Sequence, residues 1–208
     1  SSAASDVYKR QCEYNRDEII RIAKIGFEYA QKRSNKLCCV DKANVLETSR
    51  LWRETVQSME KNYPNIEVSY EFVDAVAMRL VQWPNSYDVL ITSNLFGDIL
   101  TDEASVISGS MGLMPSASVG SKHTLYEPIH GSYPEAAGKN IANPIASILS
   151  LSMMLDHSFN LKKESEIINN AVEESLKNKY VTPDLSSDKN SFTTDQVGDY
   201  IVDFIKKN

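Results

Sequence analysis

A strand that runs directly into a helix, at residues 87–102, is the sequence feature that most constrains the fold. The run YDVLIT (87–92) is apolar and prone to form a strand, and turn-forming residues at Ser93, Asn94 and Gly97 lead into a helical stretch. Strand and helix patterns also alternate upstream of this junction. Such alternation predicts an α/β fold with a mainly parallel or mixed sheet flanked by helices.

Hydrophobic periodicity and helix start signals give the expected elements. Asn15 and Glu18 have the spacing of a capping box, so a helix should begin there and end near Ser34. We expect strands at residues 36–40, 66–72 and 87–92, helices at 47–62 and 74–82, and a helix carrying Asp98 that ends near residue 107. An irregular, glycine-rich connection should follow Gly109, before helices at 144–156, 164–178 and 193–207.

The second half of the chain has several helices and too few strands to cover them. We therefore expect the sheet beneath these helices to come from sequence outside this chain, and we place a domain boundary near Ser108. Residues 1–11 (SSAASDVYKRQ) show no periodicity, and we interpret them as a non-native or disordered leader.

Charge and cysteine content exclude several classes of protein. With 22 basic and 28 acidic residues the net charge is −6, and no basic cluster indicates nucleic acid as a partner. Three cysteines, of which Cys38 and Cys39 are adjacent in the run LCCV, make a disulfide framework unexpected. No apolar run approaches ~18 residues, so neither a membrane span nor a signal peptide is predicted. These features favour a reducing cytoplasm.

Asp98 and Asp102 lie four residues apart in NLFGDILTD (94–102), so a helix would place both carboxylates on one face. Pairs of this kind are most often solvated. Here, however, they follow the carboxyl end of a predicted strand, where open α/β sheets bind ligands. Mg²⁺ and Mn²⁺ prefer oxygen ligands, which makes the pair a candidate metal site.

Four segments, in this order, carry a resemblance to a known family: VDKANVLE (40–47), VDAVAM (73–78), NLFGDILTD and EPIHGSYPEAAGKNIANP (127–144). Together they resemble the β-decarboxylating dehydrogenases of the isocitrate/isopropylmalate dehydrogenase family, from residue 13 to the C-terminus. The resemblance implies an isopropylmalate dehydrogenase-like fold of two domains, which is not a Rossmann fold, with its N-terminal part missing here. Residues 12–108 would form the dimerisation and metal domain, and residues 109–208 part of the cofactor domain.

The resemblance also implies a reaction, in which a 2-hydroxy acid with a second carboxylate is oxidised by NAD and then loses carbon dioxide. Asp98 and Asp102 would bind Mg²⁺ or Mn²⁺ together with Asp74 from the other subunit of a homodimer. Lys42 would serve as base for the substrate hydroxyl. Without the resemblance, Asp74 is the expected N-cap of the helix that follows, and Lys42 a surface lysine.

Substrate and cofactor residues are implied in the same way. Asn44 would contact substrate or nicotinamide, and Val45 would form an apolar wall that suits an isopropyl group better than a third carboxylate. The residues expected around NAD are His130, Gly131, Ser132, Tyr133, Glu135 and Asn143. Glu135 would accept hydrogen bonds from the ribose hydroxyls, which favours NAD over NADP. Outside this context, His130 is more often a structural loop histidine.

Three other functions stay open at this point. A related isocitrate, homoisocitrate or tartrate dehydrogenase shares the motifs, and a non-catalytic dimerisation module would need no further residues. A helical enzyme acting on metal-bound diphosphates shares only the spacing of Asp98 and Asp102. The family's substrate arginines and catalytic tyrosine precede the segment matched here, so we expect the chain by itself to have negligible dehydrogenase activity.

Overall fold

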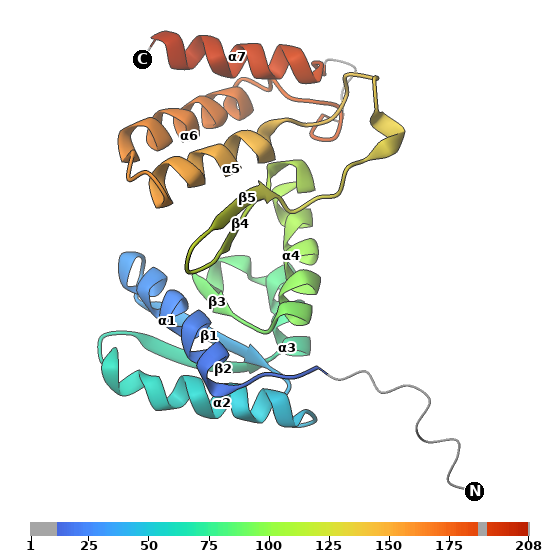
Figure 1. The fold of residues 1–208 in the computed structure, drawn as a ribbon. Coiled ribbons are helices and arrows are strands. Elements are labelled where there is room, and N and C mark those ends of the chain that lie inside the picture. Colours follow the sequence, from blue (N-terminus) through green and yellow to red (C-terminus); the bar gives the residue numbers. More distant parts are fainter. Residues whose placement is uncertain (1–11, 187–190, 208) are drawn as a thin grey trace, which may run out of the picture. The chain divides into compact units, whose positions relative to one another are not determined.

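The computed structural model describes residues 12–186 and 191–207 (Figure 1). The chain forms two compact units, of which the first ends at Ala104 and the second begins at Ser105. Both positions lie in helix α4 (Asn94–Ser108), as does the predicted boundary. The leader expected at residues 1–11 lies outside the described residues, and the roles expected for the two domains stay predictions.

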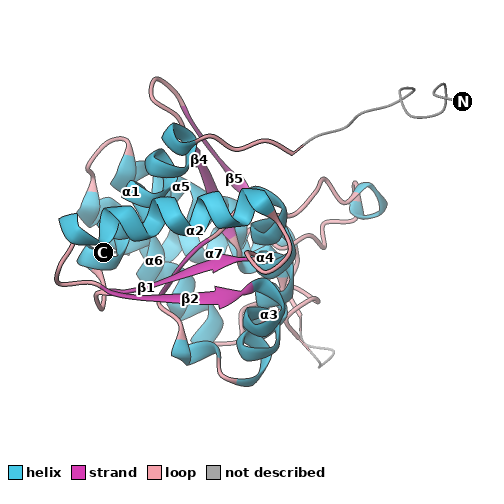
Figure 2. Ribbon diagram, turned by 90° about the horizontal axis from the view of Figure 1, so that it is seen from below, coloured by secondary structure: helices cyan, strands magenta, loops and turns pink. Residues whose placement is uncertain are grey.

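The first unit is built on a three-stranded parallel sheet. Its strands are β1 (Lys36–Asp41), β2 (Glu67–Phe72) and β3 (Val89–Ile91), in the order β2-β1-β3. Both neighbours pair with β1 in parallel, so the carboxyl ends of the strands meet at one edge, as the arrowheads of β1 and β2 show in Figure 2. Helix α1 (Arg16–Lys32) precedes β1, α2 (Glu47–Met59) lies between β1 and β2, and α3 (Val73–Gln82) lies between β2 and β3.

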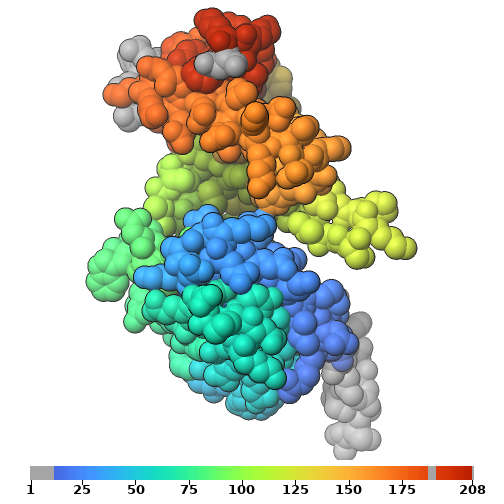
Figure 3. Space-filling model, turned by 90° about the vertical axis from the view of Figure 1, so that its left-hand side faces the viewer, coloured from blue at the N-terminus to red at the C-terminus, as the bar shows by residue number. Residues whose placement is uncertain are grey.

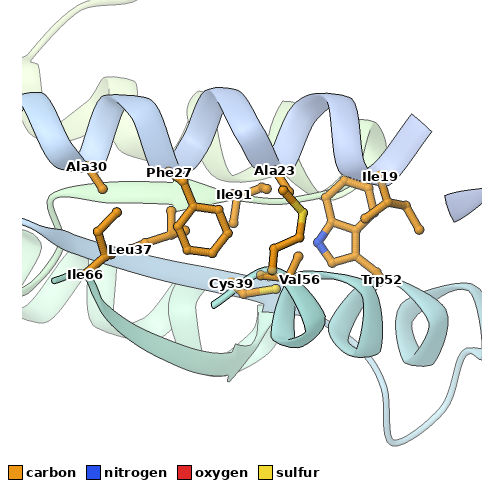
Figure 4. Close-up of a cluster of buried hydrophobic side chains, with 11 residues drawn as sticks. Ile19, Ala23, Phe27, Ala30, Leu37, Cys39, Trp52, Val56, Ile66 and Ile91 are labelled. Carbon is orange, nitrogen blue, oxygen red and sulfur yellow. The ribbon is translucent and has the colours of Figure 1, made fainter. Parts of the chain in front are cut away.

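Helices cover both faces of this sheet. Helices α1 and α2 pack on one face, where Ile19, Phe27 and Val56 are fully buried against Leu37 and Ile91 (Figure 4). Figure 3 shows these two helices, in blue and cyan, from the outside. Helices α3 and α4 pack on the other face. A parallel sheet requires such cover, and this explains why the interior of β1, the run LCCV between Lys36 and Asp41, is continuously apolar instead of alternating.

Cys38 and Cys39 illustrate the two-sided burial of β1. Both are free thiols, and successive side chains of a strand point to opposite faces. Cys39 accordingly joins the cluster under α1 and α2, and Cys38 joins the cluster under α3 and α4. The expected reducing compartment stays a prediction.

Helix α1 forms as the sequence predicts. Asn15 Oδ1 accepts a hydrogen bond from the Glu18 N–H, and Glu18 Oε2 accepts one from the Asn15 N–H, each at 3.0 Å, which confirms the capping box. Ile19, Ala23 and Phe27, spaced by one helical turn, have no exposed surface. Burying a large apolar side chain of this kind contributes about 1.5–3 kcal/mol, so this stripe fixes α1 to the sheet.

In the described part of the second unit, three helices and a β-hairpin follow the last turn of α4. The helices are α5 (Ile145–His157), α6 (Lys162–Lys177) and α7 (Thr194–Lys207), with a core that includes Ile145, Ala171 and Val197. Strands β4 (Pro115–Val119) and β5 (Thr124–Pro128) pair antiparallel. Our prediction of an irregular connection after Gly109 was wrong here.

The physical reason for this error lies in the composition of the hairpin. Its prolines and serines lower strand propensity, but Pro115 begins β4 and pairs with Pro128 at the end of β5. Proline is tolerated at the ends of edge strands because it need not donate to a ladder there. Parallel and antiparallel pairings thus occur in two separate sheets, within the predicted α/β fold.

Two general features of the fold bear on function. The strands contradict an all-helical enzyme, which removes the diphosphate alternative. Of the helices in the described ranges, none has both the length and the apolar character needed to cross a membrane.

Asp88 ties the end of α1 to the start of β3. Its carboxylate accepts hydrogen bonds from the Ser34 hydroxyl, from the Ser34 N–H at 2.9 Å and from Arg33 Nε at 2.5 Å. These hydrogen bonds lower the pKa of Asp88 to about 2, and the two from Ser34 have the largest effect. The charged carboxylate therefore stabilises the fold above its ordinary pKa of 3.8, and this contribution is lost as the pH falls towards 2.

We expect Asp88→Asn to lower the melting temperature at neutral pH, and the difference from wild type to shrink below pH 4. Thermal unfolding followed by circular dichroism at several pH values measures this. Asp203→Asn is the matched control, because Asp203 is an exposed helical carboxylate with Lys206 Nζ at 4.0 Å. A difference that does not depend on pH would contradict the assignment.

Candidate active site and cofactor cavity

Lys42 and Asp74 meet at the carboxyl edge of the parallel sheet. The last residues of β1 and β2, Asp41 and Phe72, are register partners, so the residues that follow them emerge side by side. Lys42 Nζ forms an ion pair with Asp74 Oδ1 and lies 5.6 Å from the centre of the Phe72 ring. The hydrogen bond from Lys42 lowers the pKa of Asp74, which favours the charged carboxylate that a cation would bind.

Asp74 is not the N-cap of α3, and this alternative interpretation was wrong. The helix begins at Val73, its N-cap is Phe72, and no side chain caps it. Asp74 instead lies in the first turn, with its side chain 66% exposed. A carboxylate there interacts favourably with the helix dipole and keeps its oxygens available to a ligand.

Asp98 and Asp102 are exposed on α4, which follows β3 and begins at the same edge of the sheet. Asn94 Nδ2 donates to Asp98 Oδ2 at 3.4 Å. Across residues 12–186 and 191–207, no three His, Cys, Asp or Glu side chains are grouped so that they could hold a metal ion. The chain therefore does not gather Asp74, Asp98 and Asp102 by itself, and a third ligand from a second subunit stays a prediction.

Asn44 and Val45 lie in the turn between β1 and α2. Both are exposed, and the Val45 side chain retains 62% of its surface. The turn is closed by the Lys42 carbonyl, which accepts hydrogen bonds from the N–H groups of Val45 and Leu46 at 2.9 Å each. Val45 is thus an exposed apolar side chain three residues after Lys42, and it is accessible to a substrate, as the predicted apolar wall must be.

Three residues that our sequence reasoning missed hold this turn. Asp41 is buried at the end of β1, where it accepts hydrogen bonds from Arg53 and from the Ala43 N–H. Ser49 Oγ accepts one from the Lys42 N–H at 3.0 Å. The available signal was an acidic residue closing the apolar run LCCVD, followed by Ser49 and Arg53 at helical spacing.

A cavity of about 550 Å³ in the second unit gathers most of the predicted cofactor residues. Its lining includes His130, Gly131, Ser132, Tyr133 and Asn143, together with Gly112, Ile141 and Asp184. The volume falls in the range of small-molecule sites, about 300–1,000 Å³. Glu135 is not part of this lining, because it lies exposed in the short 3-10 turn Pro134–Ala136.

Backbone geometry shapes the loop that forms one wall of this cavity. Tyr133 adopts a left-handed conformation with φ of 45°, and its side chain is 56% exposed. His130 Nδ1 lies 2.8 Å from the Gly131 carbonyl oxygen, which is the local hydrogen bond that a structural loop histidine makes. His130 therefore has a structural contact as well as a place in the cavity.

Asp184, which our sequence reasoning also missed, connects three segments of the cavity wall. Its carboxylate accepts hydrogen bonds from Ser110 Oγ, from Thr182 Oγ1 at 2.5 Å and from Asn143 Nδ2 at 3.0 Å. Burial raises the pKa of Asp184, but these hydrogen bonds outweigh that effect and lower it overall. An acidic residue in a loop without periodicity gave no sequence signal for this role.

Comparisons with known proteins identify relatives over most of the chain. The sequence profile of the isocitrate/isopropylmalate dehydrogenase family matches residues 4–201. The 3-isopropylmalate dehydrogenase of Aquifex aeolicus is 54% identical over 176 residues, which cover 85% of this chain and 48% of that protein. That of Buchnera aphidicola subsp. Diuraphis noxia is 51% identical over 196 residues, covering 94% and 54%. The chain thus spans about half the length of these curated relatives.

Solved structures share the fold. The isocitrate dehydrogenase of Methylococcus capsulatus superimposes with a TM-score of 0.91 at 37% identity, covering 95% of this chain and 59% of the other. A β-decarboxylating dehydrogenase of Thermococcus kodakarensis, in its apo form, gives a TM-score of 0.85 at 35% identity, covering 99% and 60%. The predicted fold class is confirmed.

Gly112 lies directly against Asn143, so a larger residue at position 112 tests whether this cavity binds the cofactor. A Cβ atom at position 112 would approach Asn143 Cβ to 2.6 Å, so we expect Gly112→Ala to displace Asn143 and weaken NAD binding by about tenfold or more. Isothermal titration with NAD measures this. Gly198→Ala is the matched control, because the new Cβ meets nothing within 4 Å and should stabilise α7 by about 0.5–1 kcal/mol. Unchanged NAD affinity in Gly112→Ala would contradict the predicted cofactor site.

Proposed function

The chain belongs to the isocitrate/isopropylmalate dehydrogenase family, and we propose that the protein carrying it is an NAD-dependent 3-isopropylmalate dehydrogenase. In this proposal it oxidises the hydroxyl carbon of (2R,3S)-3-isopropylmalate and transfers hydride to NAD. The resulting β-keto acid loses carbon dioxide and gives 4-methyl-2-oxopentanoate, a step of leucine biosynthesis.

The observation that carries the proposal is the pairing of Lys42 with Asp74 at the carboxyl edge of the sheet. A primary amine held there can accept the proton of a substrate hydroxyl once it is itself deprotonated. Its neighbour is a carboxylate whose pKa is lowered, so that it stays charged beside the reacting group. A metal-assisted alcohol oxidation requires a base for the hydroxyl proton and anionic ligands for the cation, and Lys42 and Asp74 would supply one of each.

The carboxylates suit a hard divalent cation. Asp74 of one subunit, with Asp98 and Asp102 of the other, would supply three charged oxygen ligands to Mg²⁺ or Mn²⁺. All three aspartates are exposed in the single chain, which supports this assignment because their carboxylates are accessible to a cation. When bound, the cation would stabilise negative charge on the substrate oxygen during oxidation and decarboxylation.

A homodimer would complete such a site, and the surface of the first unit supports one. Met78 and Val81 on α3 are 62% and 64% exposed, and Leu95 and Ile99 on α4 are 63% and 56% exposed. The same two helices carry Asp74, Asp98 and Asp102. Exposed apolar side chains beside the proposed ligands are what a subunit interface would bury.

The choice of substrate depends mainly on Val45. Its exposed apolar side chain suits the isopropyl group of the substrate and cannot pair with the third carboxylate of isocitrate. The similarity to the Methylococcus isocitrate dehydrogenase keeps that substrate as the second candidate. For the cofactor, Glu135 lies outside the cavity lining but only two residues beyond Tyr133, which belongs to it, and its carboxylate would favour the free 2′-hydroxyl of NAD over the phosphate of NADP.

The proposal is tested by assaying the full-length protein with 3-isopropylmalate, isocitrate, homoisocitrate and tartrate, each with NAD and with NADP. We expect 3-isopropylmalate with NAD to give a kcat/KM at least about a hundredfold above the other combinations, since an unpaired carboxylate is costly to bury. A preference for isocitrate would overturn the substrate, and no turnover with any of them would favour the non-catalytic module.

Metal dependence gives a second test. We expect Asp98→Asn to raise the Mn²⁺ concentration for half-maximal activity by at least about tenfold, because a charged ligand becomes neutral at constant size. Titration of activity with Mn²⁺ measures this, with Asp203→Asn in helix α7 of the second unit as control. Overlapping titration curves for the Asp98 variant and wild type would remove Asp98 from the metal site.

A further inference from the structure

The carboxylate of Asp41 is buried and fully paired. Its side chain is 1% exposed, yet Oδ2 accepts a hydrogen bond from Arg53 Nε at 2.7 Å and Oδ1 accepts one from Arg53 Nη2 at 3.0 Å. Oδ1 also accepts the Ala43 N–H at 2.8 Å. A charge withdrawn from water in this way needs a partner of fixed geometry, and the planar guanidinium provides one.

Arg53 is held in turn by two aromatic rings. Its Cζ lies 5.2 Å from the centre of the Phe72 ring and 5.6 Å from that of Tyr70. The Phe72 ring is also the one near Lys42 Nζ. The guanidinium and the ammonium group therefore contact the same side chain, and each has its own carboxylate, Asp41 or Asp74.

These contacts fix the backbone from which Lys42 extends. The Lys42 N–H donates to Ser49 Oγ at 3.0 Å, and the next N–H, that of Ala43, donates to Asp41. Without Arg53, the Asp41 carboxylate would be buried with no counter-charge and would have to turn towards water. That movement would release the Ala43 N–H and the turn that carries Lys42.

We propose that Asp41 and Arg53 act as positioning residues, which set the direction of the Lys42 side chain towards the reacting hydroxyl. The functional part of this inference rests on the proposed role of Lys42 as base. The geometric part does not, because it concerns only how the turn after β1 is held. Misplacing a reactive group by about 1 Å can cost a factor of about 100 in rate, so such a support would act on kcat.

Hydrogen exchange tests the geometric part in the full-length protein. We expect Arg53→Met to raise the exchange rate of the amides at residues 42–46 by about tenfold or more, with the β1 amides unchanged. Arg79→Met is the matched control, because Arg79 Nη1 pairs at 2.6 Å with Glu71 Oε1, which belongs to β2 of the same unit and not to this turn. Equal rates in Arg53→Met and wild type, or equal increases in both variants, would overturn the proposal.

Steady-state kinetics tests the functional part. We expect Arg53→Met to lower kcat by about 10- to 100-fold with little change in the KM for NAD, and Arg79→Met to leave both close to wild type. Arg53→Lys should recover part of kcat, since it keeps the charge but loses the second hydrogen bond. A loss confined to the KM for NAD would overturn the positioning role. If the wild-type protein turns over no hydroxy acid, the proposed function fails, and the exchange rates still decide whether Asp41 and Arg53 hold the turn.

Discussion

The parallel pairing of β1 with both of its neighbours is the constraint on which the first unit depends. Because β2 and β3 run in the same direction as β1, the chain must leave all three strands at one edge. Lys42, Asp74 and helix α4 each follow one of these exits. The strand order and direction that bury the apolar faces of the sheet therefore also bring Lys42 and Asp74 next to each other.

Much of the first unit could be predicted because its signals are local. The capping box at Asn15 and the continuous apolar run at Cys38 and Cys39 were read correctly from periodicity and composition alone. The β4–β5 hairpin was missed because its stability comes from pairing and from packing on α5, while its prolines and serines indicate a loop. Strand propensity alone could not outweigh those residues.

The candidate site was predictable only in part, for a related reason. Resemblance supplied residue types and order, and the structure brings Lys42 to Asp74 and gathers five of the six predicted cofactor residues at one cavity. Asp41 and Asp184 were missed because each acts through partners distant in sequence, such as Arg53 and Asn143. Asp41 is buried and Asp184 is exposed, but each carboxylate organises a loop through contacts that form only in the folded chain.

The two adjacent thiols of β1 have a consequence for chemical probing of this protein. Burial raises the pKa of Cys38 to about 11 and raises that of Cys39 still further, so neither forms the nucleophilic thiolate readily while the sheet is closed. Each thiol is covered by a different helix layer. During unfolding, alkylation of Cys39 before Cys38 would show that α1 and α2 detach first, and the reverse order would show that α3 and α4 detach first. Each face of the central strand thus has its own thiol that reports its exposure.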